Sequence, residues 1–468
     1  MIGGQGLEDV YGATIERIKA QGGYKCRLGM EALMWICYAE VPLSPDELCH
    51  ALAIELGSTD FNAANIPSIA TVVSCCQGLI TVDKEASKVR LIHFTLREYL
   101  SAPPDIFIRP HSDIAEICLI YLNSSQVKGI SVELSGDIQG APFLRYSSVY
   151  WGVHAKRELS DYARSLALEL LQDNDDHISW KLVLGKAEHL ITEHFNKGSP
   201  FSGLHGASFF GIAEVVAVFI EMECYDLNGR DCWGSTPLSL AADQGHEEVV
   251  KILVGREEVN PNKGDNFGYT PLSYATGGGH EGIVKILLER EEVNPNKPDN
   301  EGKTPLSYAA KHGREGVVKI LLGREEVKPD KSDYYGRTPL SYAAKRGHEG
   351  VVDILLKRKE VRLDKSDYYG RTPLSHAARK GHEGVVRILL ERDEVNPDMP
   401  DDKGRTPLAL AAKNGHEGVV RALLAREEVD HDKPDNSGQT PRMLAARCSH
   451  PGVIALLQPP EATIHGPV

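Results

Sequence analysis

Basic side chains recur at a fixed interval in the second half of this 468-residue chain, where Thr-Pro-Leu-Ser returns every 34 residues. One cation follows the glycine before Thr-Pro in four successive units, and further cations follow the Ala-Ala after it. These residues are Lys303, Lys311, Arg337, Lys345, Arg346, Arg371, Arg379, Lys380, Arg405 and Lys413. Lysine and arginine donate charge-assisted hydrogen bonds to carboxylates and phosphates. The pattern predicts a basic surface that binds an acidic or phosphorylated protein segment.

Two pairs of tyrosines, Tyr334-Tyr335 and Tyr368-Tyr369, precede Arg337 and Arg371 in these units. An exposed aromatic ring beside an arginine resembles the composition of binding hot spots, so the tyrosines are included in the predicted partner-binding surface. An alternative stays open, in which the cations form an ordinary solvated face and one tyrosine of each pair packs on the next turn. Residues 330–341 also repeat unchanged at 364–375, so the shared pairs could be echoes of a recent duplication.

Catalytic and metal chemistry find little support in the remaining motifs. Histidine follows glycine once per unit, and such periodic histidines are predicted to serve turns and stacking because a metal or catalytic site needs convergence on one point. They are His246, His280, His348, His382 and His416. His189 and His194 are five residues apart, which places them on different faces of a helix and argues against zinc. The sequence has neither a Gly-x-Ser-x-Gly nor a Gly-x-x-x-x-Gly-Lys-Ser/Thr motif, so it predicts a protein that is not an enzyme and holds no cofactor.

The repeated unit predicts the elements that position the cations. Thr can cap a helix whose first residue is Pro, glycines supply tight connections, and a second helix carries one apolar stripe, such as the one over residues 317–322. No unit can bury its stripe alone, whereas stacked neighbours can. Seven copies begin at Thr236 and return as far as Thr440, which predicts a solenoid of helix-turn-helix repeats.

These motifs resemble the ankyrin repeat over about half of the chain. The resemblance implies a solenoid of about eight repeats over residues 201–458, with degenerate first and last units, a disordered tail at 459–468 and a concave face that binds proteins. Two departures stand out, since Ser replaces the family's His after Thr-Pro-Leu and the family's Gly after the second helix is missing. Helix exit is therefore expected to depend on Asn-Pro, as at Asn260-Pro261.

The first 125 residues predict a winged helix. Helices are expected at 6–19, 27–39 and 66–76, a capped helix after Ser44, two strands at 78–82 and 89–93, and a helix at 95–101. Motifs such as Pro42-Leu43-Ser44-Pro45-Asp46-Glu47-Leu48 and Ile92-His93-Phe94-Thr95-Leu96-Arg97-Glu98-Tyr99-Leu100 resemble the GPI inositol-deacylase-like winged helix of fungal NACHT-ankyrin proteins, which are NLR-like receptors. Residues 126–200 are predicted to be a helical spacer, with helices at 157–173 and 179–195.

The resemblance to NACHT proteins implies two further expectations. The chain would correspond to the C-terminal portion of such a receptor, and His93 would be the residue that contacts the phosphate of a bound nucleotide. Because no phosphate loop is present, that role requires a partner that carries the NTPase domain. Otherwise His93 is a structural residue at a strand end.

Composition limits the functional classes further. The formal net charge is -14, and the predicted helix at 66–76 contains no Arg or Lys, so nucleic-acid binding is not expected. Nine cysteines without a Cys-x-x-Cys pair, and no apolar run of 18 residues, predict a protein of the cytoplasm or nucleus with no membrane association. Three functions stay open: a protein-interaction scaffold, the sensing fragment of a nucleotide-switched receptor, and a transcriptional protein whose winged helix contacts DNA. The absence of Arg and Lys at 66–76 argues against the third.

Overall fold

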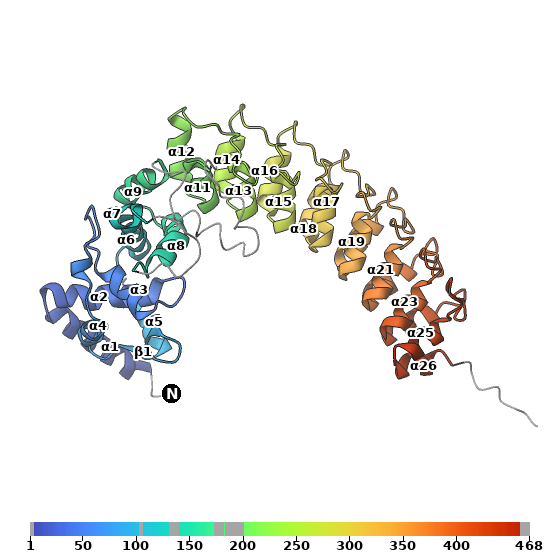
Figure 1. The fold of residues 1–468 in the computed structure, drawn as a ribbon, viewed down its shortest axis with the longest axis horizontal. Helices are drawn as coiled ribbons and strands as arrows, with labels where there is room; N and C mark the ends of the chain where they lie inside the picture. Colours follow the sequence, from blue (N-terminus) through green and yellow to red (C-terminus); the bar gives the residue numbers. More distant parts are fainter. Residues whose placement is uncertain (1–3, 103–105, 131–139, 173–181, 183–200, 459–468) are drawn as a thin grey trace, which may run out of the picture. The chain divides into compact units, whose positions relative to one another are not determined.

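The computed structural model describes residues 4–102, 106–130, 140–172, 182 and 201–458 (Figure 1). The chain forms two compact units, Met1–Cys232 and Trp233–Val468. Helices dominate both units, and the strands of the described residues form one hairpin, so the prediction of a mostly helical fold is confirmed. The predicted tail at 459–468, His189, His194 and nearly all of the predicted helix at 179–195 lie outside the described residues.

The first unit begins with the winged-helix elements and continues into longer helices. Its elements are α1 (Gly4–Ala20), α2 (Gly23–Tyr38), α3 (Pro45–Leu52), η1 (Ala63–Asn65), α4 (Ile69–Cys75), β1 (Ile80–Asp83), β2 (Lys88–Leu91), α5 (Phe94–Leu100), α6 (Pro110–Asn123), α7 (Ser125–Lys128), α8 (Leu144–Arg157), α9 (Asp161–Gln172), α11 (Gly203–Phe210) and α12 (Ala213–Glu221). The two strands are antiparallel, with Ile80 opposite Leu91 and Asp83 opposite Lys88. The capping box at the start of α3 is present, because Ser44 Oγ accepts from Glu47 N (3.2 Å) and the Glu47 carboxylate accepts from Ser44 N (2.6 Å).

Aromatic packing joins the winged-helix elements to the helices that follow them. Trp35 is fully buried in α2, with its ring centroid 5.5 Å from Phe143 and 5.6 Å from Tyr146. The predicted helix at 157–173 is present as α9, but it begins later than predicted, at Asp161, because α8 extends to Arg157. Ser160 explains the break, because its hydroxyl accepts from Ala163 N (3.0 Å) and caps α9.

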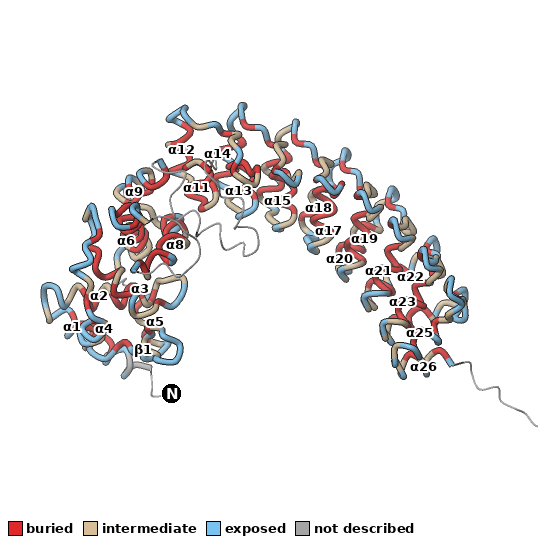
Figure 2. Tube along the Cα trace, viewed as in Figure 1, coloured by how far each residue is buried: buried red, intermediate tan, exposed pale blue. Residues whose placement is uncertain are grey.

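The second unit is a stack of helix pairs. Its elements are α13 (Pro237–Gln244), α14 (Glu247–Val254), α15 (Pro271–Gly278), α16 (Glu281–Leu288), α17 (Pro305–Lys311), α18 (Glu315–Leu322), α19 (Pro339–Arg346), α20 (Glu349–Leu356), α21 (Pro373–Lys380), α22 (Glu383–Leu390), α23 (Pro407–Asn414), α24 (Glu417–Leu424), α25 (Pro441–Arg447) and α26 (Pro451–Leu456). First helices contact first helices of the next pair, and second helices do the same. Figure 2 shows buried residues along these contacts and exposed residues in the loops.

Each helix pair begins as the sequence predicts. Thr338 caps α19 through a bond from Ser341 N (3.1 Å), and Pro339 is the first helical residue. Gly347 ends α19 with φ near 80°, and a Cβ there would lie 2.6 Å from Nδ1 of His382 in the next repeat. The glycine is therefore required by its backbone angle and by the close approach of the neighbouring imidazole.

The periodic histidines bind across repeats, which confirms their predicted stacking role. His280 Nε2 lies 3.0 Å from the Asp243 carbonyl oxygen, and His348, His382, His416 and His450 contact the carbonyls of Lys311, Lys345, Arg379 and Lys413 at 3.1 to 3.2 Å. Where Arg314 replaces histidine, its Nε donates to the Gly277 carbonyl (3.2 Å). These bonds satisfy carbonyl groups that a helix end leaves unpaired and tie each repeat to the preceding one.

Helix exit without the family's glycine depends on two devices. Asn260 accepts from Asn262 N (2.9 Å), so Asn-Pro forms a side-chain turn as the sequence suggests. In addition, the arginine that follows the second helix donates to a carbonyl at the end of the preceding repeat's second helix. Arg358 contacts the Leu322 carbonyl at 2.9 Å, and Arg290 and Arg426 make the same contact with Val254 and Leu390.

An aspartate organises each of six successive turns of the second unit, and it is buried in all of them except that of Asp435. Asp333 Oδ1 accepts from Tyr335 N (3.0 Å) and Arg337 N (2.8 Å), while Oδ2 accepts from the Tyr342 hydroxyl (2.6 Å). Asp265, Asp299, Asp367, Asp401 and Asp435 accept the same two backbone bonds in their own turns. In the four repeats of Asp265, Asp299, Asp333 and Asp367, a tyrosine or histidine of the first helix also bonds to the carboxylate, which therefore joins the turn to that helix.

Asp333→Ala leaves two amide groups and a buried phenol without their acceptor, so we expect the free energy of unfolding to fall by about 3 kcal/mol. Asp435→Ala is the matched control, because Asp435 is less buried and its two backbone bonds are the only ones it accepts within the described chain. Its loss should cost about 1 kcal/mol. Urea unfolding followed by circular dichroism measures both values, and equal losses would contradict the role assigned to Asp333.

Histidine replaces tyrosine in one repeat of this carboxylate network. Tyr274 and Tyr342 donate to Asp265 and Asp333 (both 2.6 Å), whereas His376 Nε2 lies 2.9 Å from Asp367 Oδ2. Burial lowers the pKa of His376 below its usual value, although Asp367 opposes the shift. The folded protein therefore binds fewer protons at this histidine than the unfolded chain, and the resulting stabilisation is lost as pH falls through the unfolded pKa of about 6.5.

His376→Tyr should remove this contribution, so the fall in stability between pH 7.5 and pH 5.5 should be smaller in the variant than in the wild type. Asp367 stays ionised over this range because, despite burial, the hydrogen bonds from His376 and backbone amides keep its pKa below the usual value. Tyr342→His is the reciprocal control and should add pH dependence. Urea midpoints at the two pH values test both variants, and unchanged pH dependence in both would contradict the assignment.

Candidate partner-binding surface

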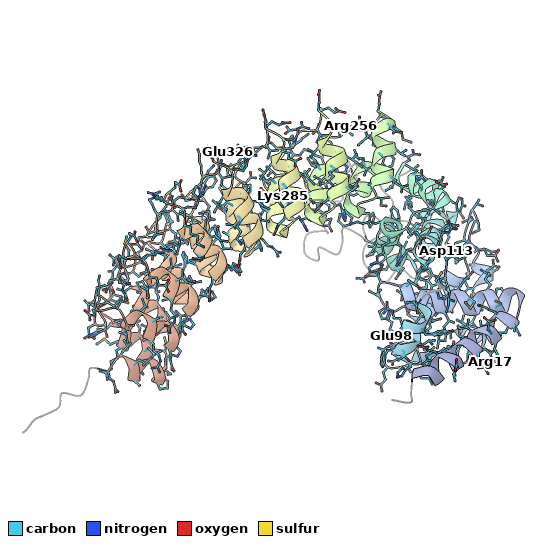
Figure 3. All side chains as sticks on the ribbon, turned by 180° about the vertical axis from the view of Figure 1, so that it is seen from behind. Arg17, Glu98, Asp113, Arg256, Lys285 and Glu326 are labelled. Carbon is cyan, nitrogen blue, oxygen red and sulfur yellow. The ribbon has the colours of Figure 1, made fainter. Side chains whose placement is uncertain are left out.

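The strongest candidate site is a column of cations at the C-terminal ends of the first helices. Lys311, Lys345, Arg379 and Lys413 occupy equivalent positions in α17, α19, α21 and α23, and each is partly or fully exposed. None of them forms an ion pair with a carboxylate of the described chain. The column lies at the opposite end of the helix pairs from the loops after the second helices, where Figure 3 shows Arg256 and Glu326.

One member of this column was missed in the sequence analysis. Arg447 lies 34 residues after Lys413, ends α25 and is exposed, and its Nη1 donates to Gln439 Oε1 (3.1 Å). The repeat period alone would have found it. Lys311, Lys345, Arg379, Lys413 and Arg447 are called the basic column below.

Cations of neighbouring repeats lie close enough to act on one another. Burial lowers the pKa of Lys345, and the positive charges of Arg337, Arg346, Lys380 and Arg379 lower it further. The pKa of Lys311 is likewise lowered by burial and then by Lys303, Arg346 and Arg337, against the opposing charge of Glu301. Positive charges from both predicted sets of cations therefore act on these two lysines, and an anion bound here would relieve their mutual repulsion.

The cations of the turns are already engaged with carboxylates. Arg337 Nη2 lies 2.8 Å from Asp333 Oδ2, Arg405 Nη2 lies 2.6 Å from Asp401 Oδ2, and Arg371 Nε approaches Asp401 at 3.9 Å. Lys303 pairs with Glu301 and is nearly buried. A ligand could take Arg337 and Arg405 only in competition with bonds that shape the turns, so these cations are weaker binding candidates than the basic column. Arg371 differs, because its Nε is buried without a hydrogen-bond partner within the described chain.

All four paired tyrosines are exposed at the turn tips. The exposed fractions are 74% for Tyr334, 44% for Tyr335, 76% for Tyr368 and 48% for Tyr369, so neither pair buries one ring in the next turn. Arg337 stacks over the Tyr335 ring at 4.6 Å, and Arg371 stacks over the Tyr369 ring at 5.1 Å. The rings are available for contact with a partner, and their arginines hold two of them in place.

Acidic residues occupy the loops after the second helices. Glu257, Glu258, Glu291, Glu292, Glu325, Glu326, Glu427 and Glu428 are exposed, as the sequence suggests. Arg290, Arg324 and Arg426 pair with the second glutamate of their own loops. The glutamates of these loops are therefore either paired with an arginine or remain as negative charges. The cations of the basic column, in contrast, have no ion pair within the described chain.

His93 caps α5 of the winged helix and is exposed. Its Nδ1 lies 3.3 Å from Thr95 N and 2.7 Å from Thr95 Oγ1, and its ring centroid lies 4.5 Å from that of Phe94. This geometry assigns His93 a structural role at the junction of β2 and α5.

The described residues offer neither a metal site nor a membrane-spanning helix. Those residues contain no cluster of three or more His, Cys, Asp or Glu side chains that could hold a metal ion. They also contain no helix of the length and apolarity needed to cross a bilayer.

Comparisons with known families agree with both halves of this description. Residues 16–106 match the family described as "GPI inositol-deacylase, winged helix domain". Residues 180–265, 256–333, 317–401 and 393–465 match the family described as "Ankyrin repeats (3 copies)". A comparison with functionally curated proteins found no match. The ankyrin matches together span more than half of the chain, which therefore belongs to the ankyrin-repeat family.

Proposed function

We propose that this protein is a non-catalytic scaffold whose ankyrin repeats hold an acidic or phosphorylated segment of a partner protein. Ankyrin repeats imply protein partners in general. The observation that carries the finer proposal is the basic column, in which five equivalent cations of successive repeats have no ion pair within the described chain. On a chain of net charge -14, such a localised basic surface selects for anionic partners.

The exposed tyrosines extend the proposed surface toward the turns. Tyr334, Tyr335, Tyr368 and Tyr369 supply contact area at low conformational cost. The turn cations Lys303, Arg337, Arg371 and Arg405 border the same surface, but carboxylates lie close to them, so they contribute less than the basic column. We further propose three functional parts, a winged helix at 1–125, a helical spacer at 126–200 and a solenoid at 201–458, acting in the cytoplasm or nucleus.

Charge reversal tests the proposal directly. Lys345→Glu combined with Arg379→Glu should abolish recovery of the partner from an extract of the source organism at low salt, because it replaces two adjacent members of the basic column. Lys285→Glu combined with Lys319→Glu is the matched control, since these exposed lysines lie one repeat apart on the second helices α16 and α18. Affinity capture with mass spectrometry compares the variants. A partner that both variants retain equally would overturn the basic-column proposal.

A second candidate is the regulatory fragment of a fungal NACHT-type receptor, which acts with an NTPase-bearing partner. The match of residues 16–106 to a winged-helix family and the exposed ring of His93 favour it. In this case, His93→Ala should lose the nucleotide-dependent recovery of that partner. His93→Asn separates the two roles, because asparagine retains the cap of α5 but not the imidazole. Equal recovery by wild type, His93→Ala and His93→Asn would exclude a nucleotide sensor at His93.

A further inference from the structure

The spacing of the basic column is fixed by the stacking of the repeats. Each pair of successive first helices from α17 to α25 is in contact, and packed helices have axes about 8–10 Å apart. The carbonyl oxygens of Lys311, Lys345, Arg379 and Lys413 each contact a histidine of the next repeat at 3.1 to 3.2 Å. The same histidines therefore set the interval of the column and occupy the helix-end carbonyls, which would otherwise repel an anion.

Three regular conformations of a bound segment can be compared with this interval. In a β-strand, residues on one face are two positions and about 6.6 Å apart, which is too short. In polyproline II, every third residue lies on the same face and one turn rises about 9.3 Å, which fits the helix spacing. An α-helix would match with one acid in seven residues, at about 10.5 Å.

The surface around the basic column favours the polyproline II segment over the helix. A docked helix needs an apolar groove for its apolar face. The large exposed apolar or aromatic residues described in the second unit are Phe267, Tyr334, Tyr335, Tyr368, Tyr369 and Met443, and none lies at the C-terminal end of a first helix. Polyproline II has no internal hydrogen bonds to protect and can lie on a polar surface.

We propose that the basic column binds a polyproline II segment with an acidic residue at every third position. This inference rests on the proposed scaffold function and specifies its ligand. The five cations would match acidic residues at positions 1, 4, 7, 10 and 13, so a full ligand spans about thirteen residues. Arg346 and Lys380 follow Lys345 and Arg379 in the last turns of α19 and α21, so the central positions of the basic column have the highest density of positive charge. A phosphorylated residue, whose charge is about -2, fits there best.

Synthetic peptides of equal composition distinguish the effect of the spacing between acidic residues from the effect of their total charge. One fluorescent peptide carries five glutamates three residues apart, with proline and alanine between them. Isomers of the same length carry the glutamates contiguously or in alternation, and a longer peptide carries them every seventh residue in a helix-forming sequence. Fluorescence anisotropy at low salt with the full chain measures the dissociation constants. We expect the three-residue spacing to bind about tenfold more tightly than either isomer and than the helical peptide.

The variants then assign the binding to the column. Lys345→Glu with Arg379→Glu should remove the preference for three-residue spacing, whereas Lys285→Glu with Lys319→Glu should preserve it. Equal affinity for all peptides, with loss in the first variant, would overturn the spacing and leave the scaffold proposal standing. Tighter binding of the helical peptide would overturn the polyproline II conformation. Failure of every peptide to bind at low salt would overturn both the ligand and the acidic-segment function.

Discussion

The second unit depends on a buried carboxylate at the start of each repeat. A carboxylate without partners is costly in a low-dielectric interior, so its position is stable only when its oxygens are filled by hydrogen-bond donors. In the repeat of Asp333 these donors are two backbone amides of the turn, the Tyr342 hydroxyl and the Arg337 guanidinium. The same hydrogen bonds therefore fix the conformation of the turn and the orientation of the first helix. They also occupy the turn arginine, which is then not free to bind a ligand. The carboxylate acts within one repeat, whereas the histidines at the other end of the first helices bond to the preceding repeat and hold successive first helices together.

The repeat architecture was predictable because its signals are local and recur. Thr-Pro, the Gly-His pair and the apolar stripe each involve only a few neighbouring residues. Because the unit recurs seven times, a signal that is ambiguous in one copy is clear from the others. The break between Arg157 and Asp161 occurs once, at a serine cap, and a continuous helical pattern concealed it. The packing of Trp35 against Phe143 and Tyr146 depends on contacts between residues more than 100 positions apart, which the pattern of either segment does not specify.

The sequence was enough to predict which residues form the candidate site, but not which of its cations are paired with carboxylates. Counting cations identified ten residues of the surface, and the period also points to Arg447. Which of these cations remain unpaired depends on the side chains that reach each aspartate. Leu410 occupies the position of Tyr342 in a later repeat and offers no hydroxyl, and there Arg405 donates to Asp401 through two nitrogens. Arg337 makes the same two contacts with Asp333 although Tyr342 is present, and the pattern of cations in the sequence does not specify these pairings.

Identical segments of this chain consequently differ in their interactions. Residues 330–341 and 364–375 have the same sequence, yet Arg337 bonds to the aspartate of its own turn, whereas Arg371 approaches Asp401 of the next repeat. The difference follows from the residue just after each segment. Tyr342 shares Asp333 Oδ2 with Arg337, while His376 contacts the equivalent oxygen of Asp367 and Arg371 reaches that aspartate only through its backbone amide. A duplicated motif therefore does not duplicate a binding site, because the charge available to a ligand is set by neighbours outside the copied segment. The basic column is less sensitive to this effect, since its side chains lie at helix ends where no carboxylate of the described chain pairs with them.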